Sequence, residues 1–185
     1  MKQNLLYILV FALFLFFIYL LLSNSSLHKN NIDVVDDIEI ENYMGKWYSV
    51  YETPTYYGIW PFGYNSQECT HTTATYSQNS DGTITVNNCC IYNNNDLCIE
   101  GLAGFENDPA DGMLWVEFTP PFRSPYLILG ISQYYDWAVV GNPHRSSLWI
   151  LSRQPSISSS DLNLALDIAE SQGYNLDNLY EVNHK

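Results

Sequence analysis

The sequence predicts an all-β domain in which an antiparallel sheet of eight strands is followed by one helix. Apolar and β-branched runs alternate with turn signals at a spacing of about 8–12 residues. Aromatic residues make up 15% of the 185 residues, which is enough for a hydrophobic core. Only one stretch, near the C-terminus, has apolar residues at helical spacing. Eight strands can form a sandwich or a closed barrel, and this pattern alone does not choose between them.

The first element is an apolar run at residues 5–22 that contains no charged residue, Gly or Pro. At about 1.5 Å per residue it reaches ~27 Å, close to the hydrocarbon thickness of a bilayer. We interpret residues 1–26 as a signal anchor with a transmembrane helix; a cleaved signal peptide is the alternative. Positive charge at Lys2 predicts a translocated domain, membrane-anchored and extracytoplasmic, or secreted if the segment is cleaved.

Residues 27–42 are polar and then acidic, and we predict that they form a solvated tether between the membrane and a folded domain at residues 43–185. The whole chain carries 20 acidic and 7 basic side chains, for a formal charge of −13. Nucleic-acid binders neutralise phosphates with Lys and Arg, so this balance excludes a nucleic acid as partner.

Turn chemistry separates the predicted strands, with Asn, Asp, Gly and Pro at the breaks. The strands are expected at Met44–Thr53, Cys69–Gln78, Thr83–Tyr92, Leu97–Glu106, Met113–Thr119, Tyr126–Ser132, Tyr135–Gly141 and Ser147–Arg153. Ser160 is then expected to cap the single helix, which Gly173 follows, and a short ninth strand is plausible at Leu179–Val182.

Three motifs distinguish the barrel from the sandwich. They are a G-x-W opening at Gly45–Trp47, a Y-x-x-A-x-V segment at residues 135–140 and an L-W-I-L-S-R-x-P strand at residues 148–155. With these motifs the chain resembles the lipocalin family, in the branch of bacterial outer-membrane lipocalins and apolipoprotein D. The resemblance implies an eight-stranded antiparallel up-and-down closed barrel with the helix packed outside. It also implies that Trp47 packs under Arg153 to close the base, beside Gly45.

Alternation along the strands predicts which side chains line the interior of such a barrel. Leu114, Val116 and Phe118 share one face of their strand, and Glu117 lies on the other. If Trp47 points inward, strict alternation also points Tyr51 inward. The full set of predicted ligand-binding residues is Tyr51, Leu114, Val116, Phe118, Tyr126, Ile128 and Trp149. This apolar lining suits a fatty acid, a lysophospholipid or a similar small hydrophobic ligand; a barrel filled by its own aromatic side chains is the alternative.

The loop after the first predicted strand is rich in aromatic residues, with Tyr56, Tyr57, Trp60 and Phe62. It falls at the expected mouth of the barrel. These rings could cover the mouth as a lid, insert into a membrane interface, or pack against one another.

All four cysteines, Cys69, Cys89, Cys90 and Cys98, lie in a short window of the chain. An even count in a translocated domain is typical of two disulfides. Simple hairpins between the strands place Cys69 and Cys90 on one face and Cys89 and Cys98 on the other, diagonally in both cases. Diagonal neighbours are about 7–8 Å apart, so the bonds Cys69–Cys90 and Cys89–Cys98 need a bulge or a shifted register.

Neither a catalytic constellation nor a metal site is recognisable, because the histidines are scattered and the cysteines lack zinc-site spacing. We therefore expect a protein that is not an enzyme and needs no cofactor or metal. The expected function is binding, storage or transport of a lipophile. The alternative is a surface scaffold whose mouth loops bind a protein or glycan partner.

Overall fold

The computed structural model describes residues 32–57, 64–107 and 111–185, so the predicted signal anchor at residues 1–26 lies outside the described residues. Within the described ranges, no helix is both long enough and apolar enough to cross a membrane.

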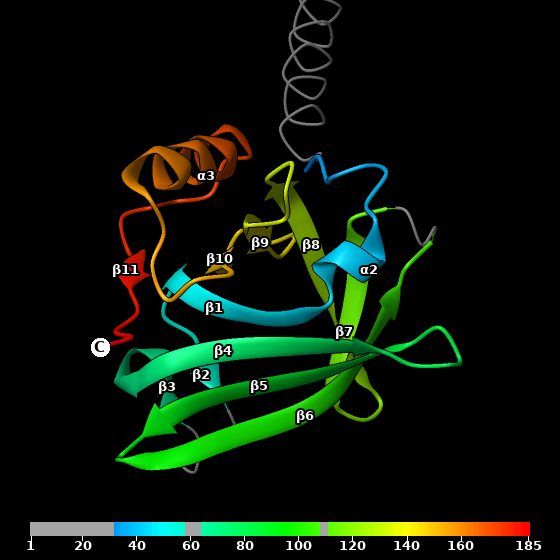
Figure 1. Ribbon diagram of the computed structural model, residues 1–185, viewed down its shortest axis with the longest axis horizontal. Helices are drawn as coiled ribbons and strands as arrows, with labels where there is room; N and C mark the ends of the chain where they lie inside the picture. Colours follow the sequence, from blue (N-terminus) through cyan, green and yellow to red (C-terminus); the bar gives the residue numbers. More distant parts are fainter. Residues whose placement is uncertain (1–31, 58–63, 108–110) are drawn as a thin grey trace, which may run out of the picture. The chain divides into compact units, whose positions relative to one another are not determined.

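Eight antiparallel strands form a closed barrel (Figure 1). Each strand pairs with the next along the chain, and β10 pairs with β1 to complete the circle. This confirms the closed barrel that the family resemblance implies. The barrel strands are β1 (Gly45–Glu52), β4 (Cys69–Gln78), β5 (Ile84–Tyr92), β6 (Asn95–Phe105), β7 (Met113–Thr119), β8 (Phe122–Ile131), β9 (Trp137–Gly141) and β10 (Leu148–Ser152).

Three short strands supplement the barrel. β11 (Tyr180–Glu181) pairs with the last residues of β1, close to the predicted ninth strand. β2 (Tyr56–Tyr57) and β3 (Tyr64–Asn65) pair with each other as a separate two-stranded sheet. A 3-10 turn, η1 (Ser66–Glu68), then leads into β4. We call the end of the barrel with the turns at 93–94 and 142–147 the mouth, and the opposite end the base.

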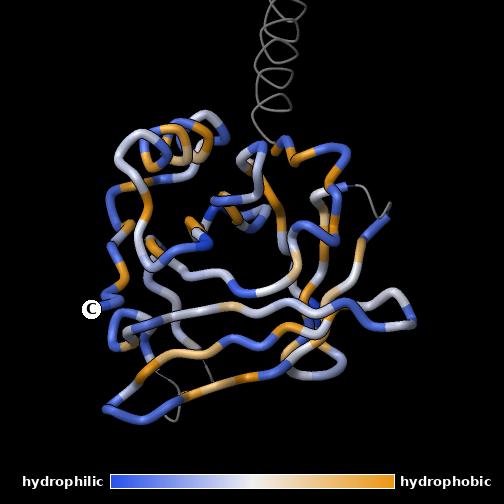
Figure 2. Tube along the Cα trace, in the orientation of Figure 1, coloured by the Kyte–Doolittle hydropathy of each residue, from blue (hydrophilic) through white to orange (hydrophobic). Residues whose placement is uncertain are grey.

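The predicted helix is α3 (Ser159–Ser171), which packs outside the barrel against β8 and β9. Its N-cap is Ser158, two residues before the predicted cap, and the Ser158 side chain accepts a hydrogen bond from the Asp161 amide. The helix approaches the sheet closely, because a Cβ at Gly130 would lie 2.7 Å from Ile168 Cδ1. Figure 2 shows strongly hydrophobic stretches in β8, β9 and β10, and every residue of β9 is buried.

The predicted tether at residues 27–42 extends too far, because its second half belongs to the folded domain. The amide of Val35 donates to Ile128 O at 2.9 Å, and Val35 O accepts from the Gly112 amide at 2.8 Å. Ile38 and Ile40 are buried in the barrel core, and the short helix α2 (Ile40–Tyr43) closes the base. The apolar residues among the carboxylates therefore decide the placement of this segment, and the acidic side chains remain on its outer side.

The turn between β5 and β6 is two residues shorter than predicted. Tyr92 pairs with Asn95, so only Asn93 and Asn94 form the loop. Both have positive φ, 50° and 61°, which suits a two-residue hairpin turn and which Asn tolerates better than most residues. The shift moves the register by two positions and places Cys89 directly opposite Cys98.

Candidate ligand site in the barrel

A stacked pair closes the base of the barrel. The Arg153 guanidinium carbon lies 3.7 Å from the ring centroid of Trp47, which is fully buried. The indole Nε1 donates to Tyr43 O at 2.8 Å, and the guanidinium donates to Lys46 O at 2.9 Å and to Asn42 O at 2.6 Å. Among the described residues, this guanidinium thus contacts a ring face and main-chain carbonyls.

Gly45 lies directly beside that pair. Its φ is +87°, a conformation that L side chains rarely adopt, and a Cβ there would lie 3.6 Å from Arg153 Nη1. Gly45, Trp47 and Arg153 therefore lie together at the base, and their fold-closing role stays a prediction.

Three tyrosine hydroxyls form a hydrogen-bonded chain across the base half of the interior. Tyr126 Oη lies 2.7 Å from Tyr43 Oη and 2.8 Å from Tyr76 Oη. Burial raises the pKa of Tyr43 and Tyr126 well above the usual value and that of Tyr76 to about 12. The chain is therefore uncharged at neutral pH and links α2, β4 and β8 by hydrogen bonds.

The structure brings the predicted lining residues together, with one exception. Leu114 and Ile128 belong to the fully buried core cluster. The remaining members are partly buried and pack against that cluster; they are Val116, Phe118, Tyr126 and Trp149. Their role in ligand binding stays a prediction, but their position on a common inner wall is what such a role requires.

Toward the mouth, the inner wall becomes accessible to solvent. Ile99 pairs with Asn88 and shares the inner face of β6 with Gly101 and with Ala103, which is buried in the core. Ile99 is nevertheless 45% exposed, whereas Ala103 at the base end is 1% exposed. The base half of the interior is thus filled by side chains, and the mouth half has exposed inner surface.

The exception among the predicted lining residues is Tyr51. A bulge in β1 shifts its pairing with β10, so that Ser49 opposes Leu151 but Tyr51 opposes Ile150 and Glu52 opposes Trp149. Leu151 and Trp149 belong to the interior cluster. The inward expectation for Tyr51 is therefore wrong, and Glu52 takes its place. Strict alternation missed Glu52, because nothing in the local sequence marks the bulge.

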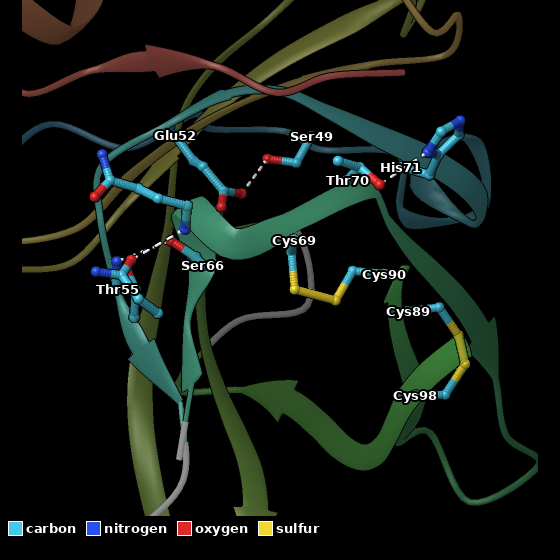
Figure 3. The surroundings of a disulfide bond; sticks show 12 residues. Ser49, Glu52, Thr55, Ser66, Cys69, Thr70, His71, Cys89, Cys90 and Cys98 are labelled. Atoms are coloured by element: carbon cyan, nitrogen blue, oxygen red, sulfur yellow. Dashed lines mark hydrogen bonds between the residues drawn. A yellow bond between two sulfur atoms is a disulfide. The ribbon is translucent and has the colours of Figure 1, made fainter. Parts of the chain in front are cut away.

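Glu52 is the centre of a buried polar cluster (Figure 3). Its side chain is 1% exposed and accepts hydrogen bonds from Ser49 Oγ at 2.7 Å and from Tyr180 Oη at 2.5 Å. Tyr180 Oη also lies 2.9 Å from Ser66 Oγ, which accepts the Thr55 amide. Burial raises the pKa of Glu52 against the opposing effect of these hydrogen bonds. The cluster joins β1, β11 and the segment before β4.

We expect this raised pKa to make the stability of the protein pH-dependent. A carboxyl whose folded-state pKa lies above its unfolded value binds its proton more tightly when folded. The free energy of unfolding should therefore fall as pH rises through the folded-state pKa of Glu52, relative to Glu52→Gln. Urea unfolding of both proteins between about pH 4 and pH 8 measures this difference. A constant difference across that range would contradict the expectation.

The aromatic mouth loop lies partly within the described residues. Tyr56 pairs with Asn65 and is 48% exposed, and Tyr57 pairs with Tyr64. Trp60 and Phe62 lie outside the described residues. The pairing of β2 with β3 thus holds the two ends of the loop together.

The cysteines form the two predicted disulfides, Cys69–Cys90 and Cys89–Cys98 (Figure 3). Cys69 opposes Tyr92, so it stands diagonal to Cys90, with the two Cα atoms 5.7 Å apart. A bulge follows in β4 at residues 71–72, where His71 has a φ of 57°. The two sulfur pairs lie on opposite faces of the β5 strand.

Sequence comparisons identify relatives across most of the chain. Residues 38–184 match the family model of the lipocalin-like domain. Temperature-induced lipocalin-1 of Arabidopsis thaliana is 33% identical over 162 residues, which cover 83% of each chain. Outer membrane lipoprotein Blc of Vibrio cholerae is 29% identical over 174 residues, covering 92% of this chain and 97% of the relative.

Solved structures show the same fold at lower sequence identity. Insecticyanin of the tobacco hornworm Manduca sexta superposes with a TM-score of 0.62 at 14% identity, covering 84% of this chain and 85% of that one. Lobster apocrustacyanin A1 gives 0.61 at 15% identity, covering 80% of each chain. Together with the barrel, the stacked base and the outer helix, these matches show that the chain belongs to the lipocalin family, in the branch that includes the Blc lipoproteins.

Proposed function

We propose that the protein binds, stores or transports a small lipophilic ligand inside the mouth half of its barrel. The observation that carries this proposal is the inner wall itself. Val116, Phe118 and Trp149 pack against the buried core but are themselves only partly buried, and Ile99 nearby is 45% exposed. Covering such apolar surface with a ligand is favourable by roughly 25 cal/mol per Å² before the costs of association.

The proposed location is the outer side of a membrane. The apolar run at residues 5–22 would hold the chain there as a signal anchor, and a secreted protein would result if that segment were cleaved. Relatives named outer membrane lipoproteins support an extracytoplasmic site for a domain of this kind. Mass spectrometry of the mature N-terminus tests whether the anchor is retained.

Titration with the neutral dye Nile red tests the proposed ligand site. We expect saturable fluorescence enhancement by the purified protein and a loss of roughly tenfold or more in affinity for Phe118→Asp, which places a charge on the apolar wall. The matched control is Leu164→Asp, because Leu164 is 54% exposed on the helix outside the barrel. Its affinity should stay within about twofold of the parent protein.

Circular dichroism shows whether each variant remains folded. If Phe118→Asp does not fold, Val116→Thr keeps the shape of the side chain and should still weaken dye binding. Equal affinities of the folded Val116→Thr or Phe118→Asp protein and its parent would overturn the inner-wall site. Failure of the folded parent protein to bind any lipophile would instead favour a scaffold whose mouth loops bind a partner.

A further inference from the structure

We propose that the barrel selects an uncharged lipophile with a hydroxyl end over one with a carboxylate end, such as a fatty acid. Thr72 and Asn88 would take the hydroxyl, and the buried carboxyl of Glu52 would exclude the anion. This inference rests on the proposed function, because it names the class of ligand for the same interior.

Two buried polar atoms of the inner wall have no hydrogen-bond partner among the described residues, Thr72 Oγ1 and Asn88 Oδ1. Asn88 opposes Ala74, which packs against the interior cluster, and Thr72 precedes Ala74 by two residues on β4. Thr73 opposes Cys89 and so lies on the other face, which makes Thr72 and Asn88 diagonal neighbours on the inner face. The exposed Ile99 opposes Asn88 on the other side, so solvent-accessible inner wall begins next to this pair.

A single hydroxyl group satisfies both atoms. It can donate its proton to Asn88 Oδ1 and accept the proton of Thr72 Oγ1. A carboxylate has no proton to donate, so Asn88 Oδ1 would remain unsatisfied, and a buried acceptor without a partner is costly. The two atoms without a partner, Thr72 Oγ1 and Asn88 Oδ1, thus favour an alcohol over a carboxylate of the same chain length.

The charge of the wall acts in the same direction. Glu52 points to the interior and is 1% exposed, and its hydrogen-bond donor Ser49 lies on the inner face of β1, beside β4. Within the described residues, the guanidinium of Arg153 is held by Trp47 and main-chain carbonyls at the base. The other basic side chains described lie off the inner wall: Lys46, Arg123, Arg145 and Lys185. A carboxylate ligand would therefore meet the acidic side chain of Glu52 on this wall and, among the described residues, no free cation.

Displacement of Nile red by three competitors with the same chain tests the inference: dodecanol, dodecanoate and methyl dodecanoate. Dodecanoate is ionised at about pH 8. We expect dodecanol to bind roughly tenfold or more tightly than dodecanoate, because the buried anion would lose its hydration beside an acidic side chain and would leave Asn88 Oδ1 unsatisfied. Methyl dodecanoate should fall between them, because it has no charge and no proton to donate.

Two variants test which residues cause the expected preference for dodecanol over dodecanoate. Glu52→Gln should strengthen dodecanoate binding by roughly tenfold and leave dodecanol within about twofold. Asn88→Leu should weaken dodecanol several-fold and leave methyl dodecanoate unchanged. The control Glu100→Gln removes a charge from the exposed side of β6 and should change none of the affinities.

The outcomes separate the inference from the proposed function. Equal binding of dodecanol and dodecanoate, unaltered by Glu52→Gln, would overturn the selection and leave the lipophile site intact. A folded parent protein that binds neither Nile red nor any competitor would overturn both. If Glu52→Gln is unfolded at pH 8, Asn88→Leu carries the test alone. A several-fold loss for dodecanol with methyl dodecanoate unchanged supports the inference, and equal losses for both would contradict it.

Discussion

Replacement of Trp47 by alanine is expected to lower the free energy of unfolding by about 3–5 kcal/mol, the range for removal of a large buried aromatic ring. The ring is fully buried and packs beneath Arg153, and its Nε1 donates to Tyr43 O. Its loss would leave a cavity at the base and expose the guanidinium to an unfilled space. Chemical unfolding followed by circular dichroism measures the change.

The chain offers a matched control for this substitution. Trp115 also lies beneath a guanidinium, with Arg123 at 3.7 Å from its ring, but that pair sits on the outer wall and Arg123 is 57% exposed. Trp115→Ala should therefore cost only about 1–2 kcal/mol. Similar losses for the two alanine variants would show that the Trp47–Arg153 stack stabilises the fold no more than the exposed Trp115–Arg123 stack does.

Removal of the Cys69–Cys90 disulfide is expected to lower the free energy of unfolding by about 3 kcal/mol. The bond joins residues 21 apart in the sequence, and its closure restricts the unfolded chain. It also connects β4 to β5 just before the β4 bulge. The double variant Cys69→Ala/Cys90→Ala, unfolded in urea beside the parent protein, gives the value.

The second disulfide supplies the comparison. Cys89–Cys98 closes a shorter loop, with a sequence separation of 9, and its loss should cost about 2.5 kcal/mol. This shorter loop restricts the unfolded chain less, so less chain freedom returns when the bond is removed. A larger loss for Cys89→Ala/Cys98→Ala than for the first pair would contradict this loop-length argument.

Turn chemistry made much of the fold predictable. The predicted ranges Cys69–Gln78 and Met113–Thr119 coincide with β4 and β7, because strong breakers flank these runs. The cysteine pairing is confirmed although the assumed β5–β6 turn was too long, since a register error of two positions preserves the faces. The closed barrel itself followed from the family motifs and not from periodicity.

Alternation predicted the apolar part of the inner wall. Leu114 and Val116 lie before the register shift in the β7–β8 pairing, and Phe118 lies within it, but all three belong to the interior cluster or pack against it. Glu52 follows the bulge in β1, and Thr72 lies in the bulge of β4. Both bulges reverse the faces, and both contact the C-terminal segment through hydrogen bonds. The polar part of the inner wall was therefore missed.

The bulge in β1 also has a consequence for biosynthesis. The carbonyls of Ser49 and Val50 are satisfied by His184 Nε2 at 2.9 Å and by the Val182 amide at 3.0 Å, and Asn183 O accepts the His71 amide. The opening strand of the domain thus completes its hydrogen bonding with residues 182–184, and the Ser49–His184 contact spans 135 positions of the sequence. Final assembly of the sheet must wait until this late segment has left the ribosome, and a nascent domain without it would expose an unfinished sheet edge.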